Sequence, residues 1–466
     1  MSNFPMVDIL PGERIISAEE VLSPTDPVFN SRLRPDIDTA LHLSSGKVGK
    51  WRVPFASGTF DFHIDIKDQG LFTCFFGRDS LVISALLSES NPALRIQTVC
   101  ALAENQGRNW DSASEEEPGR IPHEVRNPDD PQAQKIMNES GWRFPYYGSV
   151  DSTLLWLTAL EEITRSNPEF LDFEIEGVSL SLHAEGATNW ILQRLEDGGG
   201  YIRSDRANPK GILNQVWKDS GDSYLTYLGQ VAIESGNTSV ETIAQSYDAL
   251  LAAAQLAKLS HNRWKITPNE LTSLAQGVKE NLLEHWWIGD RFAMGLGKIA
   301  GQEVLLGAVS SNQWRVLDSA ILSAPDCALY VKQLVDTVCD PEILGPQGIR
   351  TLGKSNPRYR PAGYHTGSSW PVDAAIIVKG LLRYGARREA IEVAAPTISA
   401  IEAVGGYPEL FRSDDSEISG VSRFIIDVWD PMLSSINRVC QPPQLLQGWT
   451  IAAYHWFRSN GFYVKG

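Results

Sequence analysis

Helical periodicity runs through this chain from about residue 78 onward, and it limits the possible folds more than any other feature. Apolar residues recur at helical spacing in segments of roughly 10 to 20 residues, separated by glycine-rich and aromatic loops. The segments with this spacing are 80–90, 93–105, 152–165, 242–259, 268–287, 312–323, 328–338, 371–384, 386–402 and 443–458. Strands do not alternate with these helices, and no exact repeat of the solenoid kind occurs. The pattern predicts an all-α fold and favours a toroid of helical hairpins over a solenoid or a large bundle.

The first 70 residues have a different character. They contain prolines and acidic residues, and apolar and polar residues alternate over 60–66, which is typical of a strand. We therefore expect residues 1–70 to form an N-terminal extension with a small β element packed on the main body, and residues 71–466 to form the helical domain. In a toroid, the loops at one end of the inner helices line a funnel, which would explain why Trp, Tyr, Gly and acidic residues gather in loops here.

Composition narrows the set of partners. The chain has 41 basic and 57 acidic residues and a net charge of −16, which argues against nucleic acid and anionic membrane surfaces. The same balance disfavours highly anionic substrates. No stretch of about 18 apolar residues occurs, so we expect no membrane span.

The cysteines and the N-terminus indicate in which cellular compartment the protein works and whether it needs a cofactor. The five cysteines are widely spaced without a C-x-x-C pair, so neither a disulfide framework nor a zinc site is indicated. Scattered reduced thiols, and an N-terminus without a signal-peptide pattern, predict a cytoplasmic protein. No metal or phosphate motif occurs, so we expect side chains to do the chemistry without a cofactor.

Two acidic segments carry the functional hypothesis. One spans 217–223 and contains Asp219 and Asp222, and the other spans 405–411 and contains Glu409. Both are rich in aromatic and glycine residues. Sugar-cleaving chemistry needs one carboxyl that stays protonated and one that stays ionised. If 217–223 is helical, its two aspartates share one face and the pKa of at least one rises; the alternative is that they cap a helix.

Three further segments contain candidate sugar-binding groups. Segment 75–80 holds Arg78 and Asp79, an opposite-charge pair that could grip two sugar hydroxyls or, alternatively, belong to a helix cap. Segment 142–151 is an aromatic cluster that ends at Asp151, a candidate helix cap in the plainer interpretation. Segment 363–371 supplies His, Thr and Ser groups suited to hydroxyl recognition.

A charged loop completes the inventory of motifs. Residues 117–126 either line a pocket or form a solvated loop. His123 in this loop has no His or Cys neighbour at metal-ligand spacing, so it predicts no metal site.

Taken in order, these motifs resemble one family. They are similar to the amylo-α-1,6-glucosidase domain of glycogen debranching enzymes and to related bacterial debranching-like glycosidases, over about residues 67 to 458. The segments that carry the resemblance are 75–80, 119–126, 146–153, 214–220, 348–352, 364–371 and 407–410.

The resemblance implies a six-hairpin (α/α)6 toroid that hydrolyses an α-glucosidic bond with inversion. It places the general acid at Asp219 and the general base at Glu409, with Arg78 and Asp79 on the hydroxyls of the terminal glucose. The residues we expect to bind substrate are Phe76, Arg78, Asp79, Trp142, Asp151, Trp217, Asp222, Arg350, Tyr364, His365 and Trp370.

The chain also departs from this family. Only about 70 residues precede the first motif, without the transferase region or N-terminal β domain of family members. A short α-glucoside, such as an oligosaccharide or a glucosylated solute like glucosylglycerate, is therefore an alternative substrate. A sugar phosphorylase or epimerase and a non-catalytic sugar-binding protein are alternative functions on the same toroid. Val216 and Lys218, close to the proposed acid Asp219, say little about function.

Overall fold

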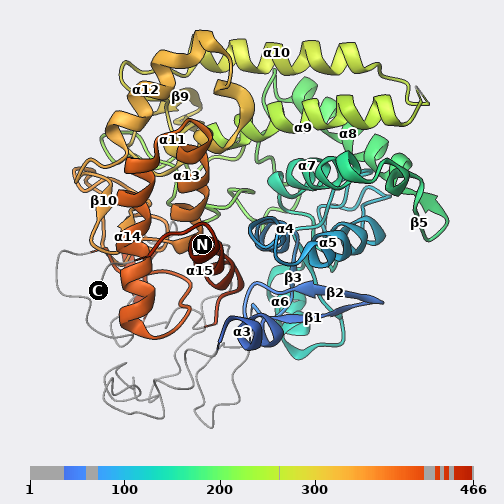
Figure 1. Ribbon diagram of the computed structural model, residues 1–466, viewed down its shortest axis with the longest axis horizontal. Helices are drawn as coiled ribbons and strands as arrows, with labels where there is room; N and C mark the ends of the chain where they lie inside the picture. The colour runs from blue at the N-terminus through green and yellow to red at the C-terminus, as the bar shows by residue number, and fades with distance from the viewer. Residues whose placement is uncertain are drawn as a thin grey trace.

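The computed structural model describes residues 36–58, 72–261, 263–413 and 446–463, and the backbone of two strands, β12 (Ile426–Asp430) and β13 (Ser435–Val439). Helices are the main regular structure of the described residues and lie side by side around one body (Figure 1). The strand expected over 60–66 lies outside the described residues. Within the described part, no helix has the length and apolar character of a membrane span.

Six helices form a closed inner ring among the described residues. Each packs against the next in chain order, and the last packs against the first. They are α4 (Gly77–Leu86), α7 (Asp151–Ser166), α9 (Val240–Leu259), α11 (Asn312–Arg315), α13 (Pro371–Arg383) and α15 (Gly448–Ser459). A ring of this kind buries one face of every helix against two neighbours, which explains why a helix such as α9 is buried along most of its length.

A second set of helices alternates with the inner ring along the chain. For example, α5 packs on α4, α10 on α9 and α14 on α13. The helices of this outer set are α3 (Ile37–Leu43), α5 (Pro92–Glu104), α8 (Leu180–Asp197), α10 (Pro268–His285), α12 (Ala328–Thr337) and α14 (Arg387–Val404). Alternating inner and outer helices make the (α/α)6 toroid, so the predicted fold class is confirmed. One further helix, α6 (Pro131–Ser140), lies in a connection between α5 and α7.

Local sequence signals set the helix ends. Helix α10 begins with the predicted capping box, in which Thr267 accepts from the Glu270 amide and the Glu270 carboxylate accepts from the Thr267 amide. A cap of this kind stabilises a helix by about 1 kcal/mol. Helix α14 ends at Gly405, whose φ of 67° lies in the left-handed region that favours glycine. That turn starts the loop that carries Glu409.

The prediction of one continuous helix over 312–323 is wrong. The structure breaks it into α11 and the 3-10 turns η2 (Val316–Asp318) and η3 (Ala320–Leu322). Ser319 causes the break, because its backbone is extended with ψ of 156° and its side chain accepts a hydrogen bond from the Ile321 amide. A serine side chain that bonds nearby backbone competes with the helix.

Helix α8 was not predicted, because its first half is rich in small and polar residues. Its Gly186 lies against Gly119, where an added Cβ would come 2.1 Å from the Gly186 carbonyl oxygen. The two glycines therefore let the 105–123 loop approach α8 closely.

Short antiparallel strands lie in the connections between the helices of the toroid. The hairpin β1 (Ser45–Val48) and β2 (Trp51–Pro54) packs on α5, while α3 packs on α15, so the described part of the N-terminal region contacts the helical body. The other strands are β3 (Phe75–Phe76), β4 (Glu124–Val125), β5 (Glu174–Ile175), β6 (Val178–Ser179), β7 (Thr238–Ser239), β8 (Gly295–Ile299), β9 (Gln302–Leu306), β10 (Leu344–Gly345) and β11 (Gly348–Ile349). The remaining 3-10 turns are η1 (Pro168–Asp172) and η4 (Pro325–Cys327).

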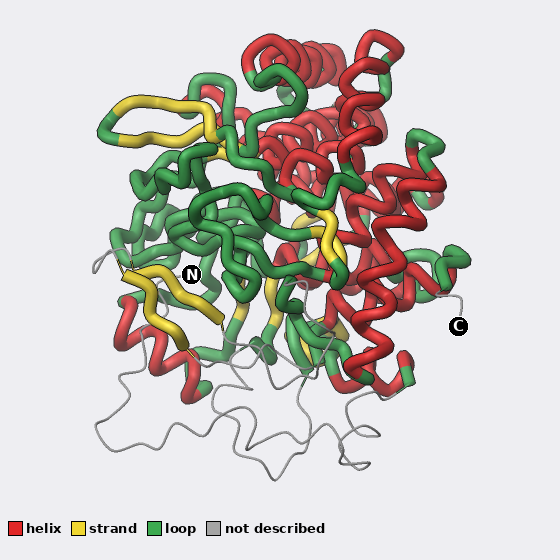
Figure 2. The backbone as a smooth tube through the Cα atoms, turned by 90° about the vertical axis from the view of Figure 1, so that its left-hand side faces the viewer, coloured by secondary structure: helices red, strands yellow, loops and turns green. Residues whose placement is uncertain are grey.

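The alternation of inner and outer helices gathers the long loops at one end. Each loop that leaves an outer helix enters an inner helix at its N-terminus, so these loops meet at the same end of the ring. Figure 2 shows the helices toward one side of the molecule and long loops toward the other. The candidate residues of the sequence precede the inner helices or lie in their first turns, so the fold brings their segments to this end.

Candidate active site

Asp219 lies in an irregular loop between α8 and α9, with its side chain 22% exposed. The next residue, Ser220, is held by His365, whose Nδ1 lies 2.7 Å from Ser220 Oγ and 3.9 Å from Asp219 Oδ1. Burial raises the pKa of Asp219, with the Asp151 charge adding to the effect and Arg78 opposing it. Burial also lowers the pKa of His365 well below its ordinary value, so the ring is neutral. These surroundings favour a protonated carboxyl at Asp219.

The helical turn that was expected to bring Asp219 and Asp222 together is absent, and the raised pKa of Asp219 has another cause. Segment 217–223 is a loop and not a helical turn, so the two aspartates neither share a helix face nor cap a helix. Burial raises the pKa of Asp222, and the charges of Arg360 and Arg358 oppose that rise. The raised pKa of Asp219 comes from its own burial first.

Glu409 lies in the loop that joins α14 to α15 and is only 4% exposed. The Tyr364 hydroxyl donates to Glu409 Oε1 over 2.5 Å. Backbone contacts fix this loop on both sides. The carbonyl of the preceding Pro408 accepts from Thr450 Oγ1 at 2.8 Å, and Phe411 exchanges backbone hydrogen bonds with Ser369. Glu409 is therefore an oriented acceptor in a rigid loop.

Two consecutive residues contact the two acidic loops. Tyr364 donates to Glu409, and His365 contacts Ser220 and lies beside Asp219. Burial raises the pKa of Tyr364 well above its ordinary value, and the charges of Glu409 and Asp219 raise it further. One loop between the two carboxyls thus sets their relative positions.

Asp79 adds a third carboxyl to the same group. Burial raises its pKa to about 7, the Arg78 guanidinium opposes the rise, and the charges of Asp219 and Glu409 add to it. Helix α4 starts from Phe76 without a side-chain cap, so the alternative that Asp79 caps the helix is wrong.

Arg78 is fixed by a buried ion pair. Its Nε donates to Asp151 Oδ2 over 2.6 Å, and Asp151 Oδ1 accepts from the Ser149 hydroxyl at 2.6 Å. Helix α7 has no side-chain cap either, so Asp151 serves Arg78 and not the helix end. The Nη2 atom of Arg78 is buried without a hydrogen-bond partner among the described residues, so its two N–H groups remain for a ligand.

Aromatic rings form one wall of the site. The Trp217 ring packs edge-to-face on Trp370 with centroids 5.7 Å apart, and His365 stacks on Trp370 at 5.1 Å. Tyr364 packs on the same tryptophan at 4.9 Å, and Trp449 also packs on it, at 5.6 Å. Trp449 had no sequence signal, because it lies on the last inner helix, far from the motifs.

Phe76 and Trp142 lie at two ends of a row of rings. Phe76 packs on the His123 ring with centroids 5.3 Å apart, and His123 packs on Tyr146 at 6.1 Å. Trp142 stacks on the far side of this row, 3.9 Å from Tyr146, and donates to the Lys210 carbonyl over 3.1 Å. The structure therefore places Trp142 in a small packed cluster, two rings away from Phe76.

Arg350 is buried among loops. Its guanidinium donates to the carbonyls of Pro341, at 2.9 Å, and of Ser413, at 3.3 Å. Its backbone pairs with Ser369, which in turn pairs with Phe411. Arg350 thus ties the Glu409 loop to its neighbours through backbone carbonyls.

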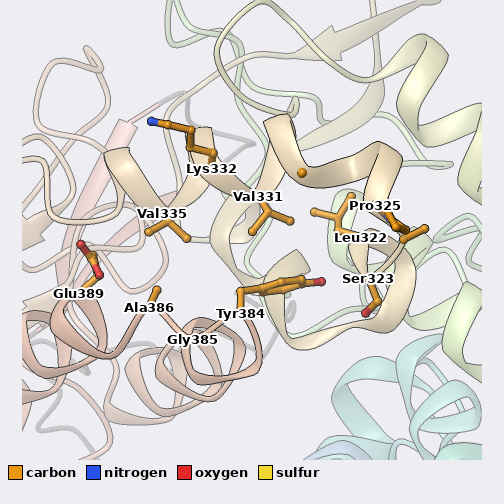
Figure 3. Close-up of a pocket in the computed structure, with 12 residues that line it drawn as sticks. Leu322, Ser323, Pro325, Val331, Lys332, Val335, Tyr384, Gly385, Ala386 and Glu389 are labelled. Carbon is orange, nitrogen blue, oxygen red and sulfur yellow. The ribbon is translucent and has the colours of Figure 1, made fainter.

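One pocket lies elsewhere and differs in chemistry. It has a volume of about 440 Å³ and lies between α12 and the turn from α13 to α14, with Leu322, Val331 and Tyr384 among its lining residues (Figure 3). Tyr384 follows the C-terminus of α13, whereas Trp370 precedes the N-terminus of the same helix. Because a helix rises 1.5 Å per residue, this pocket lies roughly 20 Å from the wall of the carboxyl site.

The chemical character of the site is that of acid–base chemistry by side chains. Among the described residues, no group of three or more His, Cys, Asp or Glu side chains is placed to hold a metal ion. The site combines a partly exposed carboxyl that favours its protonated form, a buried carboxylate that accepts from a phenol, and an Arg–Asp pair beside them.

Comparisons with known proteins agree with this chemistry. Residues 185–425, just over half of the chain, match the family described as the mannosylglycerate hydrolase MGH1-like glycoside hydrolase domain. A comparison with curated proteins gives no match.

Solved structures similar to this chain include the GH63 mannosylglycerate hydrolase from Thermus thermophilus. Its complex with Tris and D-glycerate is 12% identical with a TM-score of 0.59, and the match covers 91% of this chain and 98% of that one. Its complex with glucose is 14% identical with a TM-score of 0.57, and the match covers 92% and 100%. At such identities the likeness shows the fold alone, and it agrees with the toroid. None of these matches supports the amylo-α-1,6-glucosidase specificity that the first resemblance implies.

Proposed function

This chain belongs to the mannosylglycerate hydrolase MGH1-like glycoside hydrolase family, and from that premise we propose that it hydrolyses a small α-glycoside with inversion of configuration. The observation that carries the proposal is the pair of carboxyls beside one loop, in which Tyr364 donates to Glu409 and His365 lies beside Asp219. The class of substrate is an α-hexoside of a small hydroxy acid or polyol, such as glucosylglycerate or mannosylglycerate. This is the glucosylated-solute alternative of the sequence analysis, and it replaces glycogen debranching as the main hypothesis.

Asp219 is the proposed general acid. Its raised pKa keeps the proton that it donates to the glycosidic oxygen as the bond to the anomeric carbon breaks. A side chain that is 22% exposed can take its next proton from solvent after each turnover. The neutral His365 beside it does not compete for that proton.

Glu409 is the proposed general base. Its carboxylate accepts a proton from water while the water oxygen attacks the anomeric carbon on the face opposite the leaving group. The hydrogen bond from Tyr364 to Oε1 orients this carboxylate. Inversion in this way requires about 6.5–9.5 Å between the two carboxyls, so that the water fits between the sugar and the base.

Arg78 and Asp79 are the proposed contacts of the sugar hydroxyls. Arg78 is oriented by Asp151 and keeps one donor nitrogen, Nη2, without a partner among the described residues. With a pKa of about 7, Asp79 can donate to a hydroxyl when protonated and accept from one when ionised. Trp217 and Trp370 wall the pocket and keep bulk water from the reacting carbon.

Product analysis with a panel of α-glycosides tests the proposal. The panel contains glucosylglycerate, mannosylglycerate, isomaltose, panose and a limit dextrin, each incubated with the wild-type protein, Asp219→Asn and Glu409→Gln. We expect wild type to release hexose from a glycerate glycoside and both variants to lose that activity. Cleavage of limit dextrin in preference to the small glycosides would contradict the substrate class, and full activity in either variant would contradict the assignment of acid and base.

A further inference from the structure

Lys218 is a fully buried lysine between the wall residue Trp217 and the proposed acid Asp219, with an exposure of 0%. Its ammonium donates three hydrogen bonds: to Ser310 Oγ at 2.8 Å, to Asn312 Oδ1 at 2.6 Å and to the Thr351 carbonyl at 2.7 Å. An ammonium has three N–H donors, so these acceptors use all of them.

The three acceptors of Lys218 come from two other loops of the site. Ser310 and Asn312 lie at the start of α11, in the inner ring. Thr351 follows β11, and its amide and hydroxyl both donate to the Ser368 carbonyl, at 2.8 Å and 3.0 Å. Lys218 thus joins the loop of the acid to two neighbouring loops.

From Thr351 a continuous chain of hydrogen bonds runs to the base. The Ser368 hydroxyl donates to the Tyr364 carbonyl over 2.6 Å, and the Tyr364 hydroxyl donates to Glu409. Lys218, Thr351, Ser368 and Tyr364 therefore link the residue next to the acid with the base itself.

Charged side chains lie near Lys218, but among the described residues none forms a direct ion pair with it. Glu241 on α9 accepts from the Asn312 amide at 2.7 Å, and Asp373 on α13 accepts from Arg315 at 2.8 Å. Burial lowers the pKa of Lys218 to about 7, while the charges of Asp373 and Glu241 oppose that fall and Arg315 adds to it.

The cost of burying the Lys218 ammonium shows that the side chain does more than fill space. Burying an ammonium costs several kcal/mol, and the three direct partners of Lys218 are neutral oxygens that offset only part of this cost. An apolar side chain of the same length is the cheaper way to fill such a space. A buried cation in this place therefore points to a need for three directed bonds.

We propose that Lys218 is a positioning residue whose ammonium fixes the loop of Asp219 to the Thr351–Tyr364 chain and so sets the separation of acid and base. The kinetic part of this inference rests on the proposed function. The structural part does not, because the loop is fixed whether or not the substrate class is right.

Hydrogen exchange, read by mass spectrometry, tests the structural part. The variant is Lys218→Met, and the matched control is Lys279→Met, another buried lysine, which lies on outer helix α10 and pairs with Asp326. We expect backbone amides of 217–223 and 348–352 to exchange about ten-fold faster in Lys218→Met than in wild type, which corresponds to about 1.4 kcal/mol. The control should leave these segments unchanged. Equal exchange in wild type and Lys218→Met would overturn the proposal.

Leaving-group dependence tests the kinetic part. A glycosyl fluoride needs little help from a general acid, whereas the glycerate glycoside needs Asp219 in place. In Lys218→Met we expect kcat for the glycerate glycoside to fall about 100-fold, with KM nearly unchanged, and kcat for the fluoride to fall less than about five-fold. An equal loss of kcat on both substrates would overturn the positioning role, because it would mean that the substitution only destabilises the protein.

The two proposals fail in different ways. A wild-type protein that cleaves none of the glycosides contradicts the proposed function, and the exchange comparison still decides whether Lys218 fixes the loop. A wild-type protein that is active, with a Lys218→Met variant of unchanged kcat on both substrates, contradicts the role of Lys218 alone.

Discussion

The loop of Asp219 and the loop of Glu409 place the same functional group in two different environments. The Asp219 side chain is 22% exposed and lies beside a neutral histidine, and burial raises its pKa. Glu409 is only 4% exposed and accepts a hydrogen bond from Tyr364. A hydrogen-bond donor favours the ionised form of a carboxyl. The phenol on Glu409 and the raised pKa of Asp219 therefore agree with the proposed base and acid.

Substituting each carboxyl in turn gives the largest expected effect. Asp219→Asn should reduce kcat on the glycerate glycoside by about 10³-fold but spare a glycosyl fluoride, because only the first needs a proton on its leaving group. Glu409→Gln should reduce kcat on both by a similar factor, because both need an activated water. Steady-state kinetics with the two substrates measures these changes in kcat. If the fluoride were spared in Glu409→Gln and not in Asp219→Asn, the roles of acid and base would be exchanged.

Removing the Tyr364 hydroxyl should make the environment of Glu409 more like that of Asp219. Tyr364→Phe takes away the donor to Glu409 while keeping the ring against Trp370. We expect kcat to fall by about ten-fold, the loss of roughly one hydrogen bond to a charged group. The acidic limb of kcat/KM should move to higher pH, because the ionised base is less stabilised. A pH–rate profile identical to that of wild type would show that the phenol has no part in orienting the base.

Asp79 predicts a pH effect on stability. Its pKa in the folded protein is about 7, above the ordinary value of 3.8, so its favourable contribution is lost as the pH rises between these values. Asp79→Asn, with Arg78 still paired to Asp151, should therefore raise the free energy of unfolding by up to about 4 kcal/mol at about pH 8 and change it little at about pH 4. Urea unfolding at both pH values measures the difference, and a variant less stable than wild type at the higher pH would contradict it.

The smallest expected effect on activity is at Trp142. Because its ring packs on Tyr146 away from the carboxyls, Trp142→Phe should change kcat/KM by less than about three-fold while lowering stability by about 1 to 2 kcal/mol. Trp217→Phe is the matched substitution in the wall and should cost more activity. Kinetics and thermal unfolding of both variants separate the two positions, and a larger activity loss at Trp142 would return it to the substrate pocket.

The sequence predicted the inner helices, and it singled out candidate segments that the fold brings to one end of the ring. Strong apolar periodicity predicted all of the inner helices, apart from the break that Ser319 introduces after α11. The site segments were predictable because each inner helix is entered through a loop, and loops without a packing role rarely concentrate aromatic and acidic residues.

What the sequence did not predict depends on distant contacts. Lys218 had no signal because its partners lie 92, 94 and 133 residues away in the chain. Trp142 could not be told from a substrate-binding tryptophan, because only the fold shows that Tyr146 covers it. The glycogen-debranching specificity rested on the resemblance of short motifs alone, and the family match is the ground for proposing a glycerate glycoside instead.

Proton NMR of the first turnovers tests the central claim most directly. With a glycerate α-glycoside and the wild-type protein, the sugar first released should be the β anomer, which then equilibrates slowly with the α anomer. That result requires a water that attacks the anomeric carbon directly from the face opposite the leaving group, which is the role proposed for the water beside Glu409. Release of the α anomer first would mean a covalent intermediate with retention, and would contradict the assignment of Glu409 as a general base.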